Sequence, residues 1–155
     1  KITFPTKFDM VEPILKINHN GKVIVRMSVN PEELINRVEF GTSRLVNRIE
    51  AINKLVEAGY EVGFLIAPII LVDNWKELYE GLVKELQENL NAKAKKQVFF
   101  ELIFMTYSYI HRMINTEAFP MAINIYNPDL MTGRGKGRYT YKKIVREEKR
   151  ENKQN

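Results

Sequence analysis

Three polar side chains stand at the ends of segments with the composition of β-strands. Lys7 follows the first such segment, and Ser28 and Asn30 close the second. In parallel α/β architectures, ligands bind where the strands end, because the loops converge there. A lysine can pair with a carboxylate, and serine and asparagine offer both donors and acceptors. Lys7, Ser28, Asn30 and, after a third strand, Ala67 are therefore candidates for a polar-ligand site. In the simpler alternative, Ser28 and Asn30 only end a strand and start a helix.

A second candidate is the segment Gly133–Tyr141, which contains three glycines, three cations and two tyrosines. Glycines let the backbone turn tightly, cations can meet phosphates, and tyrosines can stack on bases. The two halves favour a β-hairpin, and the alternative is a basic loop without function. The segment lacks the spacing of a phosphate-binding P-loop. The candidate DNA-binding residues are Arg134, Lys136, Arg138, Tyr139 and Tyr141.

The other candidates for chemistry have structural explanations. His19 and His111 are too isolated to form a metal site. Glu101 lies in an apolar run, and we expect it to form a salt bridge with a nearby arginine or lysine. Asp73 is expected to cap a helix. Because the chain has no cysteine, disulfides, thiolate metal sites, cysteine nucleophiles and thiolate-held iron–sulfur clusters are excluded from these residues.

The composition is that of one soluble globular domain. The chain has 155 residues, of which 45% are hydrophobic and 28% are charged. Its net charge of +5 is compatible with a polyanionic partner such as nucleic acid, and equally with an ordinary basic surface. No apolar run approaches the ~20 residues that cross a bilayer, and no signal peptide is visible, so we expect a cytoplasmic protein without a membrane partner. The strand-like start at Lys1 suggests a fragment.

The candidate residues depend on alternating strands and helices for their positions. Strands are expected at residues 1–5, 23–29, 61–67 and 97–104. The second strand has one wholly apolar face, formed by Val23, Val25, Met27 and Val29. The fourth is expected to place Phe99, Phe100 and Phe104 in the core. Strands that alternate with helices predict parallel pairing through right-handed crossovers.

The expected helices connect these strands. They lie at residues 9–17, at 31–38, between Ser43 and Gly59, from Asp73 to Leu90, and at 107–114. A hydroxyl in Gly41-Thr42-Ser43 is expected to cap the long second helix. Residues 93–96 are expected to form a basic loop, and the residues from Lys142 onward a frayed charged tail.

Several short segments together form a signature along nearly the whole chain. They are Thr6–Phe8, Arg26–Asn30, Glu39–Ser43, Ala58–Phe64, Ala67–Ile69, Phe100–Ile103 and the Gly-Arg…Gly-Arg-Tyr-Thr-Tyr stretch from Gly133. In this order they resemble the radical S-adenosylmethionine (SAM) DNA-repair lyases of the spore photoproduct lyase family. The resemblance implies an α/β fold, namely the C-terminal half of a partial (β/α) barrel with a terminal β-hairpin. The implied divisions are the half-barrel at residues 1–123, a glycine-rich basic hairpin region at 124–145 and a charged tail at 146–155.

The resemblance also implies an activity and its cofactors. In that family SAM and a 4Fe-4S cluster sit at the strand ends, and reductive cleavage of SAM gives a 5′-deoxyadenosyl radical. The radical abstracts hydrogen from the methylene bridge of a thymine dimer lesion in DNA, and the bridge then fragments to restore two thymines. The implied enzyme is a carbon–carbon lyase. Lys7 and Ser28 match family residues that contact SAM, and Ala67 matches one whose backbone borders it.

The chain departs from the family pattern in two places. Arg134 matches the hairpin arginine near the lesion strand, but Gly135 follows where the family has tyrosine, and the spacing is one residue shorter. The family's Cys-x-x-x-Cys-x-x-Cys cluster motif and hydrogen-donor cysteine lie upstream, and this chain has neither. We therefore expect no catalytic residue and no metal ligand in this chain, no activity in isolation, and a partner in the missing N-terminal half of the barrel.

Two other functions stay open at this point. One is a different radical SAM enzyme of the lyase-like group, with another substrate. The other is a non-catalytic nucleic-acid-binding module that uses the basic hairpin and tail and has no need of SAM.

Overall fold

The computed structural model describes residues 1–104, 106–121, 131–135 and 138–141. The chain divides into two compact units. The first comprises Lys1–Ile69 and Asn74–Ile103, and the second comprises Ile70–Asp73 and Phe104–Asn155. This division lies earlier in the chain than the boundary after residue 123 that the resemblance implies, because the unit containing the hairpin also includes the helix before it.

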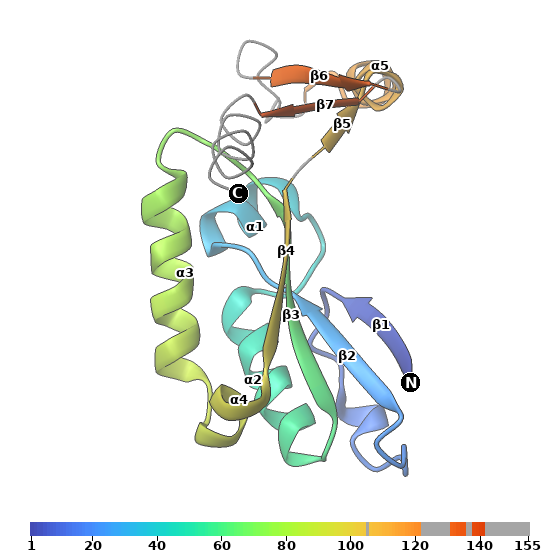
Figure 1. Ribbon diagram of the computed structural model, residues 1–155, viewed down its shortest axis with the longest axis vertical. Helices are drawn as coiled ribbons and strands as arrows, with labels where there is room; N and C mark the ends of the chain where they lie inside the picture. The colour runs from blue at the N-terminus through green and yellow to red at the C-terminus, as the bar shows by residue number, and fades with distance from the viewer. Residues whose placement is uncertain (105, 122–130, 136–137, 142–155) are drawn as a thin grey trace, which may run out of the picture. The chain divides into compact units, whose positions relative to one another are not determined.

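The first unit is built on a four-stranded sheet (Figure 1). The strand order is β1-β2-β3-β4, which is also the order along the chain. β1 pairs parallel with β2, and β2 pairs parallel with β3, so the predicted parallel pairing is confirmed for these strands. The strands are β1 (Ile2–Thr6), β2 (Val23–Ser28), β3 (Glu61–Ile69) and β4 (Phe99–Phe104).

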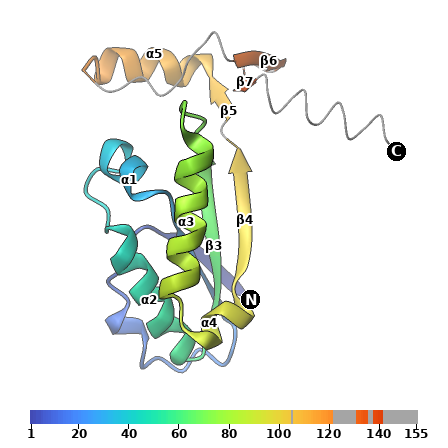
Figure 2. The ribbon, with the colours of Figure 1, turned by 90° about the vertical axis from the view of Figure 1, so that its left-hand side faces the viewer.

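Helices bury one face of this sheet. Figures 1 and 2 show α2 and α3 on the same side of the strands. Val25, Met27 and Val29 alternate along β2 and its end and are fully buried, as are Val62 and Phe64 of β3. The apolar face predicted for β2 is therefore confirmed as the core face. The helices are α1 (Glu32–Val38), α2 (Leu45–Glu57), α3 (Trp75–Asn89) and α4 (Ala92–Gln97).

The opposite face of the sheet is more exposed and carries an ion pair across three strands. Arg26 of β2 is paired in register with Gly63 of β3, and its Nη1 lies 2.9 Å from Oε2 of Glu101 on β4. The salt bridge expected for Glu101 is thus confirmed. Gly63 leaves room for the ring of Phe99 on β4, because a Cβ at that position would lie 2.3 Å from the ring.

β4 is an edge strand, and its aromatic residues are not core as the sequence suggested. The exposed fractions of Phe99, Phe100 and Phe104 are 39%, 52% and 43%. Phe100 nevertheless stacks on buried Phe64, with ring centroids 5.2 Å apart. The prediction of core burial was wrong because a single apolar run does not reveal whether a strand has a neighbour on each side.

Three local predictions of secondary structure also fail. Residues 9–17 contain only the 3-10 turn η1 (Glu12–Ile14), because Pro13 has no N–H to donate and disfavours helical backbone at the residue before it. Residues 93–96 belong to α4 rather than to a loop, and the side chain of Asn91 caps that helix. β3 continues through Pro68 to Ile69, beyond the end of its pairing with β2 at Leu65.

The predicted helix caps are replaced by other contacts. α2 begins at Leu45 with no side-chain cap from its N-cap residue, and the carboxylate of Glu32 accepts its first N–H at 2.7 Å. α3 begins after Asn74, so Asp73 does not cap it. The expected end of α2 is confirmed, since Gly59 follows with a φ of 86°.

The second unit contains a three-stranded sheet in the order β5-β7-β6. β6 and β7 pair antiparallel, which confirms the predicted hairpin at the level of the backbone. α5 starts two residues later than expected, and the side chain of Ser108 caps it by accepting a hydrogen bond from the N–H of His111. Lys136 and the side chains of the other predicted DNA-binding residues lie outside the described part. The elements are β5 (Thr106–Ser108), α5 (Tyr109–Ala118), β6 (Met131–Gly135) and β7 (Arg138–Tyr141).

Candidate functional site

The predicted strand-end residues come together at one edge of the four-stranded sheet. Lys7 directly follows β1, and Ser28 is the last residue of β2. Thr6 pairs with Met27, and Ser28 pairs with Leu65, so the ends of β1 and β2 lie side by side, next to the middle of β3. Ala67 lies in β3 two residues beyond this last pair. The parallel register therefore gathers these residues as the sequence predicted.

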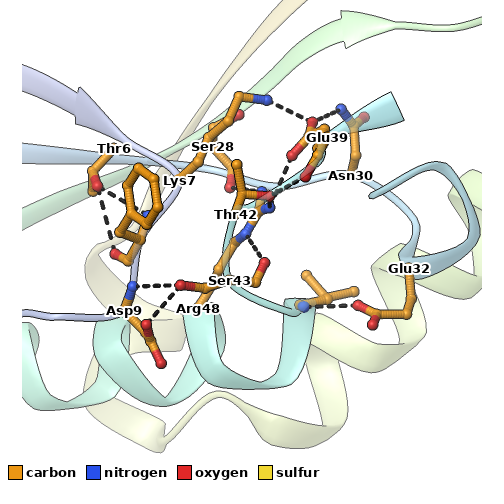
Figure 3. A network of polar contacts seen from close by, with 12 residues as sticks. Thr6, Lys7, Asp9, Ser28, Asn30, Glu32, Glu39, Thr42, Ser43 and Arg48 are labelled. Carbon is orange, nitrogen blue, oxygen red and sulfur yellow. Dashed lines mark hydrogen bonds and ion pairs between the residues drawn. The ribbon is translucent and has the colours of Figure 1, made fainter. Parts of the chain in front are cut away.

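Glu39 is the centre of the polar network at this edge, and no role had been predicted for it. It lies just after α1, and its side chain is only 6% exposed. Oε1 accepts hydrogen bonds from Nζ of Lys7 at 2.5 Å and from Nδ2 of Asn30 at 2.9 Å. Figure 3 shows both donors approaching this carboxylate. Glu39 thus joins two of the residues predicted for the site.

The ionised form of Glu39 is favoured despite its burial. Burial alone raises the pKa of a carboxyl group, because it removes the charge from water. Hydrogen bonds from Lys7, Asn30 and Arg48 outweigh burial here, and the pKa of Glu39 lies below its ordinary value of 4.5. At neutral pH the network therefore contains a buried carboxylate between two cations.

Arg48 of α2 is the second buried charge, with a fully buried side chain. Its Nη2 donates to Oε2 of Glu39 and to Oγ1 of Thr42, both at 2.8 Å. Its Nη1 donates to the carbonyl of Ser28 at 2.9 Å, and its Nε donates to the carbonyl of Ser43 at 2.7 Å. The guanidinium therefore fixes the end of β2 and the loop before α2 relative to each other. Nothing in the sequence of this amphipathic helix indicated that Arg48 would be buried.

Asn30 is fully buried, and both ends of its amide are bonded within the protein. Nδ2 donates to Glu39, and Oδ1 accepts from the hydroxyl of Tyr79 on α3 at 3.1 Å. Ligand contact by Asn30 stays a prediction, and these bonds favour a supporting role. The alternative that Asn30 only ends a strand does not account for its bond to Glu39.

A second set of contacts holds the backbone of Lys7. The N–H of Ser43 donates to the carbonyl of Lys7 at 3.2 Å. The Ser43 hydroxyl accepts from the N–H of Asp9 at 2.9 Å and donates to its carboxylate at 2.6 Å. The Ser43 hydrogen bond is the main cause that lowers the pKa of Asp9. The hydroxyl predicted to cap α2 thus ties the end of β1 to the loop instead.

Ser28 carries an unmet hydrogen-bonding group. The residue is 2% exposed, and its Oγ is buried without a partner among the described residues. Most buried polar atoms in proteins are hydrogen-bonded, so such an atom calls for an explanation. Beside it, the Lys7 side chain is 35% exposed and has donors beyond the one that meets Glu39. The edge therefore combines a partly exposed ammonium with a buried hydroxyl that has no partner among the described residues.

Two other features, a metal cluster and a membrane span, are not found among the described residues. Among them, no three His, Cys, Asp or Glu side chains are grouped so that they could hold a metal ion. None of the described helices is both long and apolar enough to span a membrane.

Comparison with known proteins gives a consistent result. The sequence profile of the spore photoproduct lyase family matches residues 1–155. Over 103 residues the chain is 42% identical to spore photoproduct lyase of Bacillus subtilis and 40% identical to that of a Geobacillus species. Each match covers 66% of this chain and 30% of the relative.

Solved structures extend the likeness over nearly the whole chain. A spore photoproduct lyase variant with bound AdoMet and dinucleoside spore photoproduct superposes with a TM-score of 0.86 at 30% identity. A second structure, spore photoproduct lyase complexed with dinucleoside spore photoproduct, gives the same values. Both matches cover 97% of this chain and 46% of the solved chain, so this chain spans about half the length of its structural relatives.

Proposed function

This chain belongs to the spore photoproduct lyase family, and we propose that it is the C-terminal half of a radical SAM lyase that repairs the spore photoproduct in DNA. Its role in that enzyme is to supply one side of the SAM site and part of the DNA-facing surface. A cytoplasmic location goes with this proposal.

The single observation that carries the proposal is the unpartnered Oγ of Ser28. It lies at the strand ends, where parallel sheets bind ligands, beside a partly exposed lysine. A solved relative has AdoMet bound, and the residues that match its family pattern are the ones gathered at this edge. The amino-acid part of SAM has a carboxylate that suits the ammonium of Lys7 and the hydroxyl of Ser28.

The chain's own residues bind and orient SAM in this proposal. Lys7 donates to the SAM carboxylate, Ser28 donates to it or to a neighbouring acceptor, and the backbone at Ala67 borders the cofactor. When bound, SAM and its 4Fe-4S cluster supply the 5′-deoxyadenosyl radical that abstracts hydrogen from the lesion. Without cysteine, this chain has no residue that fits the cluster, so the cluster ligands belong to the other half of the enzyme.

The other half of the barrel is the proposed protein partner. β1 has β2 as its one neighbour in the described sheet, so its outer edge is free to pair. Ile2 is 69% exposed on that strand, which suits a covered interface better than open solvent. The hairpin of β6 and β7 is proposed to approach the lesion-bearing DNA, with Arg134, Lys136, Arg138, Tyr139 and Tyr141 as its DNA-binding residues.

The test is repair by the full-length protein encoded at this locus. The reading frame upstream of Lys1 should encode Cys-x-x-x-Cys-x-x-Cys. The purified, cluster-loaded protein should convert spore photoproduct in DNA to thymine in a SAM-dependent reaction. SAM cleavage without repair of the lesion would favour a lyase-like enzyme with another substrate.

The basic hairpin of β6 and β7 favours one competing function, a nucleic-acid-binding module that does not use SAM. That function predicts salt-dependent DNA binding by this chain alone, since binding through phosphates releases counterions. Changing Arg134, Lys136 and Arg138 to alanine would abolish the binding. An upstream frame without the cysteine motif, together with such binding, would replace the lyase proposal with this one.

A further inference from the structure

Charges alternate from the core to the surface at the strand-end site. Arg48 is fully buried, Glu39 is 6% exposed, and Lys7 is 35% exposed. The carboxylate of Glu39 bridges the two cations, using Oε2 for Arg48 and Oε1 for Lys7 (Figure 3). The outermost group is therefore a cation whose position is set from below by a buried anion.

We propose that Glu39 is a positioning residue, which holds the ammonium of Lys7 at the site and so fixes where the carboxylate of a bound ligand must lie. This inference rests on the proposed SAM site, and it adds to that site a residue that positions Lys7. Glu39 does not need to touch the ligand, because it acts through Lys7.

A lysine without such a partner is a poor fixed point for a ligand. Its side chain has four rotatable carbon–carbon bonds, and ordering it on binding weakens affinity by about ten- to thirtyfold. The 2.5 Å contact with Glu39 orders the ammonium before the ligand arrives. The two remaining N–H donors of Lys7 stay available for a carboxylate.

Glu39 is itself held rigidly enough to do this. Arg48 binds its other oxygen, and Asn30 binds the oxygen shared with Lys7. The hydroxyl of Tyr79 fixes the amide of Asn30 by donating to its oxygen. The support thus comes from α2, α3 and the end of β2, which are packed elements rather than a surface loop.

The charges also define the ligand chemistry. The three charged groups Arg48, Glu39 and Lys7 together carry one net positive charge. A singly charged carboxylate matches it, as in the amino-acid part of SAM. Glu39 also repels any anion placed beyond Lys7. The affinity gained by ordering the Lys7 side chain must therefore exceed the affinity lost to this repulsion.

The first test measures the position of Lys7 without any ligand. The chain is treated with a small amine-acetylating ester, and the acetylation rates of Lys7 and of exposed Lys16 are followed by peptide mass spectrometry. Glu39→Gln should raise the rate at Lys7 several-fold and leave Lys16 unchanged, while Glu39→Asp should give an intermediate rate. Equal rates at Lys7 in all three proteins would overturn the inference, whether or not SAM binds.

The second test is a double-mutant cycle on SAM affinity in the full-length protein. Glu39→Gln should weaken SAM binding about tenfold in the presence of Lys7, and less than about twofold in the Lys7→Met background. Equal losses in both backgrounds would mean a general structural role, and tighter binding by Glu39→Gln would mean that repulsion prevails. Either result overturns the inference. If the wild-type protein does not bind SAM, the proposed function fails, and the acetylation rates alone decide the role of Glu39.

Discussion

Replacing Arg48 by methionine tests the buried network as a whole. Methionine is shorter than arginine and has no charge and no donor, so Arg48→Met removes the four hydrogen bonds to Ser43, Ser28, Glu39 and Thr42. The carboxylate of Glu39 then keeps only Lys7 and Asn30 as partners.

The expected loss follows from the burial of the pair. Breaking a buried ion pair by removing one partner costs about 3–5 kcal/mol. Because Glu39 keeps Lys7 and Asn30 as partners, we expect the loss of the ion pair to cost near the lower end of this range. The carbonyls of Ser28 and Ser43 also lose their donors, which adds to the loss of stability. We expect a loss of about 4 kcal/mol in the free energy of unfolding, a large part of the ~5–15 kcal/mol of a typical domain.

Urea unfolding followed by circular dichroism measures this loss, and its pH dependence identifies the cause. The folded-state pKa of Glu39 is lowered from 4.5, so its ionisation contributes stability at neutral pH that is lost as pH falls through the folded pKa. In Arg48→Met that pKa rises, so the difference between variant and wild type should shrink as pH falls. A loss below about 1 kcal/mol, or one that does not change with pH, would refute the reasoning. Arg44→Met is the matched control, since Arg44 pairs with Glu32 in solvent and should lose far less.

Three further outcomes are expected. Ser43→Ala should raise the pKa of Asp9, because its main stabilising hydrogen bond is lost; the carboxyl chemical shift of Asp9 in an NMR titration measures this. Gly63→Val should destabilise the chain by about 1–3 kcal/mol in urea unfolding, because a Cβ would meet the ring of Phe99 at 2.3 Å; an unchanged midpoint would show that the exposed ring moves aside freely. Asn91→Ala should cost about 1 kcal/mol by removing the cap of α4, with Asn91→Ser as the variant that keeps a capping oxygen without placing a second carboxylate beside Glu57.

The parts of the fold set by pattern were predictable from the sequence. The alternation in β2 identified its buried face, and the order of strands and helices gave the parallel sheet whose ends meet at Lys7 and Ser28. Polar residues at successive strand ends were enough to predict which side chains gather at this edge, because parallel strands place their ends at one edge of the sheet.

The parts that depend on contacts distant in sequence were not predictable. No burial was predicted for Glu39 or Arg48, and only the packing of α2 against the sheet shows that their side chains are buried. The exposure of Phe100 depends on β4 being an edge, which no local pattern records. The cap of α2 could not be predicted for a similar reason, since Glu32 reaches the first turn of α2 from α1.

The most direct test of the strand-end site is the SAM affinity of Ser28→Ala in the full-length protein, measured together with its unfolding midpoint without SAM. The Oγ of Ser28 has no partner among the described residues, so removing it should leave the ligand-free protein as stable as wild type or more so. If that oxygen meets the cofactor, the same change should weaken SAM binding about tenfold. Unchanged SAM affinity would contradict the account, because Ser28 would then take no part in holding the cofactor.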